Sequence, residues 1–391
     1  MINAAQANFR LHVNYRLGCG RRLELPRVVA SAGITRPLMV TDQGIAALPW
    51  FIKLAETLAA NMEVAFFSHV EPNPGLDNIL AGVEPFRAHQ PDGLVLIGGG
   101  SVMDAGKAIA LAATHPAPLF EYELARGTAH REFKAALIPP MVAMPTTSGS
   151  GSEISAGAVV TDHDEGVKRT LLHPSLTPVA VLADPEVTFG LPRTLTAGTG
   201  MDALTHALEA LCSPAYNPIA DGVAMEAIRL IGDALPVACS QPSDANARTD
   251  MMTAASMAAI AFNKGLGLVH AMAHPLGALT GTHHGLANAV LLPYVLAFNR
   301  PAIAAPMERL ARHLGLDDPG HDAVVAWVRE LRAAVGIPDR LADVPGAGDA
   351  SLIVELAPRA AEEKAYLATN PRRAREDDIR AVYEHAYAGD L

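Results

Sequence analysis

The 391-residue sequence has little cysteine, few aromatic residues and no long run of charges of one sign. Its three cysteines, Cys19, Cys212 and Cys239, lie far apart and form neither a zinc-type spacing nor a disulfide framework. The first residues lack the basic start and long apolar core of a signal peptide. No run approaches the ~18 consecutive apolar residues of a membrane helix. We therefore expect a cytoplasmic protein with no membrane partner.

The charge balance restricts the partners further. The formal net charge is -11, which argues against nucleic acid or an anionic membrane surface as the main partner. Half of the residues are hydrophobic, so a sizeable core is available. The length suits two domains of roughly 100–200 residues each.

The first half of the chain alternates between strand-like and helix-like segments. Apolar runs at 36–42, 63–70, 91–101 and 135–153 read as strands, and helical stretches such as FIKLAETLAA and VMDAGKAIALAA lie between them. This rhythm predicts a parallel sheet covered by helices. After about residue 190 the remaining segments read as helices, so we expect an α/β domain over 1–188 and an all-helical domain over 189–391.

Two loops that follow predicted strands suit a phosphate group. In the first, Gly98, Gly99 and Gly100 allow a tight turn and close approach of a ligand, and Ser101 or Asp104 can begin the next helix, whose N-terminus attracts an anion. The second, PTTSGSGSE (145–153), supplies hydroxyl groups and a flexible backbone. A plain turn and a flexible surface loop are the respective alternatives. Ligands of parallel sheets bind beyond the carboxyl ends of the strands, so the two loops support each other.

Asp42 ends the strand-like run RPLMVTD. A carboxylate there can accept hydrogen bonds from an adenosine ribose and repel a 2′-phosphate, which would favour NAD(H) over NADP(H). The alternative is a helix N-cap.

Two later segments carry histidines. In GTGMDALTHALEALC, Asp202 and His206 are four residues apart and share a helix face. The alternative for this segment alone is an amphipathic helix whose polar face contacts solvent. The segment from Gly265 to Asn299 contains no Asp, Glu, Lys or Arg, yet it holds four histidines: His270, His274, His283 and His284. Core histidines bonded to backbone carbonyls are the alternative for any one of them. For the cluster we favour a metal site, because three imidazoles and the Asp202 carboxylate would suit a divalent first-row ion.

The motifs GMDALTHALEA, GLGLVHAMAHPLGA and HHGLANAVLLP resemble the signatures of the iron-containing (group III) alcohol dehydrogenases. GGGSVMDAGKAIA and PTTSGSGSE are similar to that family's cofactor loops, and TNPRRAREDDIRAVYEHAY to its C-terminal helix. The resemblance runs over nearly the whole chain. It implies an N-terminal dinucleotide-binding α/β domain with a parallel sheet, followed by an all-α domain, an architecture shared with dehydroquinate synthase.

The resemblance also implies roles for individual residues. The metal ligands would be Asp202, His206, His270 and His284, with Fe²⁺ as the expected ion and Zn²⁺ as the alternative. His274 would act near the substrate rather than as a ligand. The residues implied for NAD binding are Asp42, Gly98, Gly99, Gly100, Ser101, Asp104, Thr146, Thr147, Ser150 and Lys168.

The expected activity is hydride transfer between NAD(H) and a small primary alcohol or aldehyde, in a homo-oligomer. Alternatives of the same fold are a maleylacetate-reductase-like enzyme, a hydroxy-acid dehydrogenase and a sugar-phosphate cyclase. A non-catalytic metal-binding protein is the alternative from a different class.

Overall fold

The computed structural model describes residues 13–123 and 133–391, which form two compact units. The sheet unit contains the described residues up to Thr147 and also Gly151–Phe189. The helical unit contains Ser148–Ser150 and Gly190–Leu391. These units are defined by contacts within the folded chain. The predicted division into domains at 1–188 and 189–391 is a statement about separate folding and stays a prediction.

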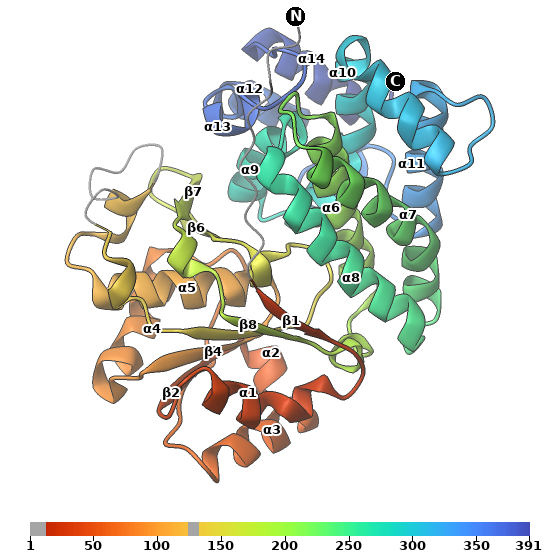
Figure 1. Cartoon of the computed structure of the whole chain (residues 1–391). Helices are drawn as coiled ribbons and strands as arrows, with labels where there is room; N and C mark the ends of the chain where they lie inside the picture. Colours follow the sequence, from red (N-terminus) through yellow and green to blue (C-terminus); the bar gives the residue numbers. More distant parts are fainter. Residues whose placement is uncertain (1–12, 124–132) are drawn as a thin grey trace, which may run out of the picture. The chain divides into compact units, whose positions relative to one another are not determined.

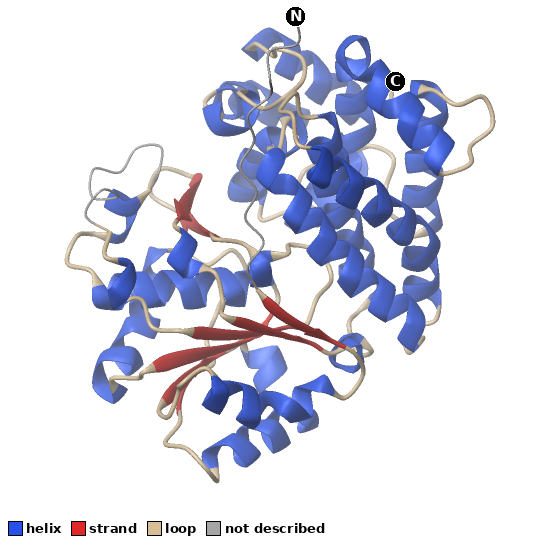
Figure 2. Ribbon diagram, viewed as in Figure 1, coloured by secondary structure: helices blue, strands red, loops and turns tan. Residues whose placement is uncertain are grey.

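The sheet unit is built on six parallel strands in the order β1-β8-β5-β4-β2-β3. Figure 2 shows strands of this sheet in red with helices above and below them. Every residue of the two strands that carry the predicted ligand loops is buried, as expected of a parallel sheet covered on both faces. The predicted parallel sheet is therefore confirmed. The strands are β1 (Asn14–Leu17), β2 (Pro37–Val40), β3 (Ala65–Phe67), β4 (Gly93–Gly98), β5 (Met141–Pro145) and β8 (Ala180–Ala183).

Helices cover both faces of this sheet (Figure 1). Two of them, α4 (Leu76–His89) and α5 (Gly100–Thr114), lie on one face. On the other face lie α1 (Leu25–Ser31), α2 (Gln43–Ala46) and α3 (Pro49–Ala59), whose apolar side chains share a buried core with the strands.

An antiparallel hairpin completes the sheet unit. It consists of β6 (Gly157–Asp162) and β7 (Val167–Leu172). Arg169 of β7 is nearly buried and forms ion pairs with Asp162 at 2.6 Å and Glu123 at 2.9 Å. The two adjacent basic residues of β7 thus have different partners, because Arg169 is neutralised by carboxylates while Lys168 donates to Oδ1 of Asn73.

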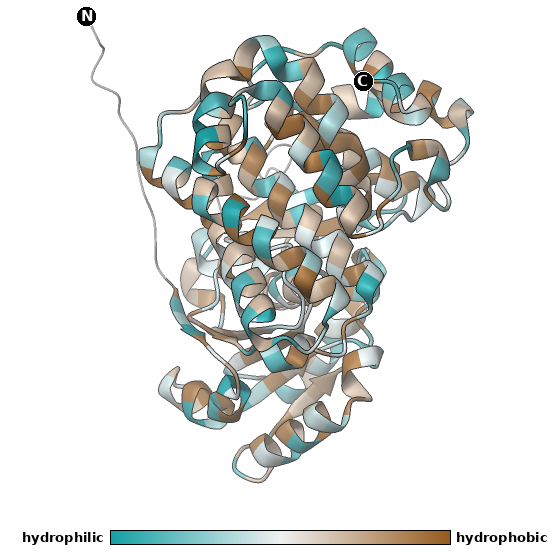
Figure 3. Cartoon of the chain, turned by 90° about the vertical axis from the view of Figure 1, so that its right-hand side faces the viewer, coloured by the Kyte–Doolittle hydropathy of each residue, from teal (hydrophilic) through white to brown (hydrophobic). Residues whose placement is uncertain are grey.

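The described residues after Ala183 contain no strand, so the predicted all-helical second half is confirmed. The α-helices are α6 (Arg193–Cys212), α7 (Pro218–Ser240), α8 (Ala245–Ala261), α9 (Leu268–Thr280), α10 (His284–His313), α11 (His321–Ala334), α12 (Ile353–Ala361), α13 (Lys364–Leu367) and α14 (Glu376–Ala388). Hydrophilic and hydrophobic positions are mixed along their outward faces in Figure 3, whereas their inner faces build one large apolar core.

The charge-free segment forms α9 and the first half of α10, and most of its side chains are buried as its composition predicts. By length and composition α10 could cross a membrane, as could α8 and α9 if they were one bent span. Within the protein, 67% of the apolar window of α10 is buried, which is the behaviour of a core helix.

Candidate active site

Helix α6 places two of the predicted metal ligands on one buried face. Asp202 and His206 are 4% and 5% exposed, so the polar stripe of this helix is not solvated. Residues four apart project from adjacent turns of the same helix face. Polar groups that are buried together in this way need partners.

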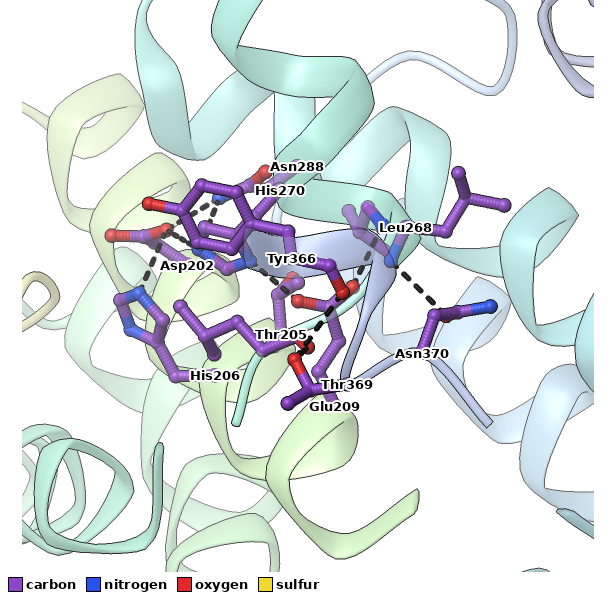
Figure 4. Close-up of polar contacts among 12 residues, drawn as sticks. Asp202, Thr205, His206, Glu209, Leu268, His270, Asn288, Tyr366, Thr369 and Asn370 are labelled. Carbon is purple, nitrogen blue, oxygen red and sulfur yellow. Dashed lines mark hydrogen bonds and ion pairs between the residues drawn. The ribbon is translucent and has the colours of Figure 1, made fainter. Parts of the chain in front are cut away.

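The partners come from α9 and α10. Oδ1 of Asp202 lies 3.9 Å from Nε2 of His206 and 4.0 Å from Nε2 of His270 (Figure 4). The same oxygen lies 3.6 Å from Nε2 of His284. Ligand atoms of Asp202, His206 and His270 all lie within 4.8 Å of one another. The structure thus gathers one carboxylate oxygen and three imidazole nitrogens, contributed by three different helices.

Helix α9 continues through Pro275, so His270 and His274 do stand one turn apart on it. His274 is 4% exposed, and its Nδ1 lies 3.7 Å from a carboxylate oxygen of Glu363. Its ring also meets the ring of Tyr366 edge-on, with 4.9 Å between the centroids. His274 therefore has an acidic and an aromatic neighbour that belong to the C-terminal segment.

His283 has a different position from its neighbour His284. It is the residue before the first turn of α10, and its ring occupies the space beside Gly198 of α6, where a Cβ atom would meet Nδ1 at 3.2 Å. His283 is thus placed against the α6 backbone, whereas Nε2 of His284 lies near the Asp202 carboxylate.

Asn288 is a member of this cluster that the sequence reasoning missed. Its amide nitrogen donates to Oδ1 of Asp202 at 2.7 Å and lies 3.1 Å from Nε2 of His284 and 3.3 Å from Nε2 of His270. The donor must face the carboxylate, since two acceptor oxygens would repel each other. The available signal was its spacing of four residues from His284 on a helix.

The donor set fits a divalent metal ion. Three imidazoles and one carboxylate suit first-row metals, and the three Nε2 atoms lie within 4 Å of one Asp202 oxygen; Asp202, His206 and His270 are buried, and His284 is partly exposed. Oδ1 of Asn288 is a buried acceptor with no hydrogen-bond partner among the described residues, as is found where a polar site is completed by something other than protein. Burial lowers the pKa of His206 to about 4, so its ring is neutral at pH 7 and keeps a lone pair for a metal.

The glycine loop joins β4 directly to α5. Gly99 is the N-cap of α5 and makes no side-chain cap, so N–H groups of the first turn remain available to an anion. A Cβ atom at Gly98 would meet Val102 at 2.4 Å, and one at Gly99 would meet Thr147 at 3.2 Å. A side chain at Gly98 would therefore force Val102 to move, whereas one at Gly99 would only crowd Thr147.

The second loop follows the adjacent strand, β5, as predicted. Thr146 donates its N–H to the carbonyl of Gly98 at 2.9 Å, which ties the two loops together. Further along, a Cβ atom at Gly149 would meet the backbone oxygen of Thr199 at 2.7 Å, so the Ser148–Ser150 segment lies directly on α6. The predicted loop residues therefore divide between the two compact units.

Three further residues implied for the cofactor, Asp42, Lys168 and Asp104, have protein partners in the structure. Asp42 caps α2 and accepts a hydrogen bond from the N–H of Ile45 at 2.8 Å. Lys168 donates to Oδ1 of Asn73 at 3.0 Å. Asp104 accepts from Oγ of Ser152 at 2.6 Å, and burial raises the pKa of its carboxyl group. Of the two interpretations of Asp42, the structure shows the helix cap. The contact between Asp42 and a ribose stays a prediction.

Two family models together cover most of the chain. The model described as "Iron-containing alcohol dehydrogenase" matches residues 13–185, and "Fe-containing alcohol dehydrogenase family, C-terminal" matches residues 196–387. The chain belongs to the iron-containing alcohol dehydrogenase family and is an oxidoreductase of the alcohol dehydrogenase type. The predicted family and fold class are confirmed.

Individual relatives agree with this assignment. The chain is 37% identical to a 4-hydroxybutyrate dehydrogenase of Cupriavidus necator over 90% of its own length and 93% of the relative's. It resembles the crystal structure of a 1,3-propanediol oxidoreductase with a TM-score of 0.89 and 35% identity, covering 97% of this chain and 100% of that one. The structure of sulfoacetaldehyde reductase from Bifidobacterium kashiwanohense in complex with NAD⁺ has a TM-score of 0.87 and 27% identity, covering 98% and 99%.

Proposed function

We propose that this chain is a metal-dependent enzyme that transfers a hydride between NAD(H) and a small primary alcohol or its aldehyde. The observation that carries the proposal is the convergence of three imidazole Nε2 atoms within 4 Å of one Asp202 oxygen. Family membership supplies the reaction class, and the buried cluster supplies a place for its chemistry.

Asp202, His206, His270 and His284 are the residues proposed to hold the cation, with Fe²⁺ favoured by the family and Zn²⁺ as the alternative. A bound divalent ion would polarise the substrate oxygen and lower the pKa of an alcohol, and the nicotinamide would accept or give the hydride. The protein contributes a donor set already gathered, in which Asp202, His206 and His270 are at most 5% exposed and His284 is the member that reaches the solvent.

We assign the substrate proton to His274. An imidazole exchanges protons near neutral pH, and the ring is held between Glu363 and Tyr366. Glu363 provides a negative charge 3.7 Å from Nδ1 that would stabilise the ring when it carries the extra proton. His274 would thus pass a proton while the four other side chains hold the ion.

The cofactor side of the proposal uses backbone N–H groups of the glycine loop and hydroxyl groups of the second loop. The NAD⁺ complex of the reductase relative supports NAD(H) as the cofactor. The residues proposed to contact it are Asp42, Gly98, Gly99, Gly100, Ser101, Asp104, Thr146, Thr147, Ser150 and Lys168.

The substrate is proposed to be a short molecule with a polar group at its far end. The three relatives are named for a hydroxy acid, a diol and a sulfonated aldehyde, which share that design. A cytoplasmic homo-oligomer is part of the same proposal.

Metal analysis combined with a substrate panel tests the function. The wild-type protein, loaded with Fe²⁺ or Zn²⁺, is assayed by NADH oxidation with short aldehydes, hydroxyaldehydes and ω-aldehyde acids, with and without chelator. Asp202→Asn should lose metal and activity together. His274→Ala should keep its metal and lose activity. His283→Ala is the matched control, since it removes an adjacent imidazole that is not a proposed ligand.

Full metal occupancy in Asp202→Asn, or chelator-resistant activity in the wild type, would contradict the metal-site assignment. A metal-free His274→Ala protein would make His274 a ligand. Metal binding without turnover of any compound in the panel would instead favour the non-catalytic alternative.

A further inference from the structure

Glu209 lies on the same face of α6 as Asp202 and His206, seven and three residues further along the helix. Its carboxylate is nearly buried, with 8% of the residue exposed. One oxygen, Oε2, lies 2.6 Å from Nδ1 of His270 (Figure 4). The other, Oε1, accepts the N–H of Val269 at 2.7 Å. One face of α6 therefore provides two predicted metal ligands, Asp202 and His206, and a carboxylate that contacts the far side of a third predicted ligand, His270.

The second contact of Glu209 meets a need of α9 itself. Gly267, the N-cap of α9, has no side chain to bond the free N–H groups of the first turn. Those groups are capped from outside, since Val269 donates to Glu209 and Leu268 donates to Oδ1 of Asn370 at 3.1 Å. A Cβ atom at Gly267 would lie 2.9 Å from the Asn370 oxygen and 3.1 Å from the Glu209 oxygen, so the glycine makes room for both caps.

The contacts on the two sides of the His270 ring specify one tautomer. A carboxylate can only accept, so the nitrogen facing Glu209, Nδ1, must carry the proton. The amide nitrogen of Asn288 can only donate, so the nitrogen facing it, Nε2, must present a lone pair. This is the tautomer in which Nε2 is available to a metal.

We propose that Glu209 is a positioning residue that fixes the tautomer and the orientation of the His270 ring and couples both to the first turn of α9. The inference rests on the metal site of the proposed function. Outer carboxylates of this kind orient metal-binding histidines and increase their basicity. Glu209 does this while its second oxygen anchors the backbone one residue before His270.

A purely structural cap is the competing explanation, and Asn370 provides the matched control. It caps the same turn of α9 but has no contact with the His270 ring among its hydrogen bonds. Glu209→Gln is close in shape to the wild type. Its amide can satisfy the Val269 N–H only by turning its NH₂ group toward Nδ1 of His270, which favours the opposite tautomer.

The test measures affinity for Zn²⁺ and Fe²⁺ by chelator competition, together with the thermal transition of each variant. Glu209→Gln should lose roughly 10–100-fold in metal affinity, whereas Asn370→Ala should retain the wild-type affinity even where its transition temperature falls. Glu209→Asp keeps the charge with a shorter reach and should fall between the wild type and Glu209→Gln. Equal losses in Glu209→Gln and Asn370→Ala would overturn the proposal in favour of a cap.

A second measurement needs no metal. Nitrogen-15 spectra of histidine-labelled apoprotein report the tautomer of each ring, and His270→Asn identifies the His270 signals. His270 should be protonated at Nδ1 in the wild type and shift toward Nε2 protonation in Glu209→Gln. An unchanged tautomer overturns the inference about Glu209, whereas a wild type that shows the expected tautomer but binds no metal overturns the proposed function.

Discussion

Each of the two compact units contains a buried charged side chain beside its predicted ligand-binding residues, and the two charges have opposite sign. In the helical unit Glu209 gathers two N–H groups, from the first turn of α9 and from a histidine ring. In the sheet unit Lys107 is fully buried and gathers four oxygens from the segment Ser152–Gly157. In both units the local backbone determines the charge of the buried side chain. A helix N-terminus exposes N–H donors, which a carboxylate can accept, and an irregular segment exposes carbonyl oxygens, to which an ammonium group can donate.

The Lys107 ammonium group is held closely. It lies 2.6 Å from the carbonyl of Ser152, 2.8 Å from its hydroxyl oxygen, 2.9 Å from the carbonyl of Ser155 and 2.8 Å from that of Gly157. The same Ser152 hydroxyl donates to Asp104. Helix α5, which begins at the glycine loop, is thereby fastened to the end of the second loop, and the sequence analysis did not identify Lys107.

Removal of this cation should have the largest effect. Lys107→Met leaves several buried oxygens without their donor, and breaking a buried charged network typically costs about 3–5 kcal/mol of unfolding free energy. Urea denaturation measures the loss, and the KM for NADH should rise with it because the Ser152–Gly157 segment loses its anchor. Lys53→Met, a substitution of an exposed lysine on α3, is the control and should be neutral. A Lys107→Met protein of wild-type stability would show that the network is dispensable.

The stability difference between the wild type and Lys107→Met should also change with pH, in a direction set by the pKa of Lys107. Burial lowers the pKa of Lys107 from 10.5 to about 8, against the opposing attraction of Asp104. Between those values the unfolded chain holds a proton that the folded chain has released, so the contribution of Lys107 to the unfolding free energy rises with pH through this window and is constant below it. The stability difference between the wild type and Lys107→Met should therefore widen by roughly 2–4 kcal/mol from pH 8 to 10.5. A gap that stays constant would contradict the lowered pKa.

Each unit has a tightly packed glycine, and alanine substitutions there separate a contact with a backbone from a contact with a side chain. A Cβ atom at Gly285 would meet the backbone oxygen of Gly198 at 2.2 Å, whereas one at Gly106 would meet the side chain of Leu96 at 2.2 Å. At Gly222 of α7 nothing lies within 4 Å. A backbone must shift more than a side chain, so Gly285→Ala should destabilise by about 3 kcal/mol, Gly106→Ala by less, and Gly222→Ala should stabilise by up to ~1 kcal/mol. Thermal or urea unfolding gives the order, and a reversal of the first two would contradict the argument.

The smallest expected effect concerns the choice of cofactor. Because Asp42 caps α2, the clean substitution is Asp42→Asn, which keeps the cap and removes the charge. A carboxylate near a 2′-phosphate is repulsive, and ~1.4 kcal/mol of lost repulsion corresponds to a tenfold change. The wild type should prefer NADH, and kcat/KM for NADPH relative to NADH should rise roughly tenfold in the variant. An unchanged ratio would leave Asp42 as a cap alone.

The sequence predicted well where a local pattern has a direct structural meaning. Buried strands followed by glycine or hydroxyl-rich turns gave the parallel sheet and its two loops, and the spacing of Asp202 and His206 placed both side chains on one face. The absence of charge from Gly265 to Asn299 predicted burial. These features depend on residues a few positions apart, for which periodicity suffices.

The parts that were missed depend on pairs distant in sequence. Glu209 and His270 are separated by 61 residues, and Lys107 lies 45 residues from Ser152. Each residue taken alone reads as an ordinary charged position of an amphipathic helix, because nothing local indicates that it is buried. For Asp42 the sequence left capping and ribose binding open, since both call for the same side chain; the structure shows the cap, and the ribose contact stays a prediction.

Helix α6 carries Asp202, His206 and Glu209 on a single stripe, and this arrangement has a consequence for how such a chain can change by insertion and deletion. One residue added or removed between them rotates the later part of the helix by about 100°, which would turn some of these side chains away from α9 and α10 all at once. Point substitutions remove one contact at a time and leave the others in place. Length changes should therefore accumulate in the connections outside Arg193–Cys212, and the number of residues between Asp202 and Glu209 should be inherited unchanged even where the intervening side chains vary.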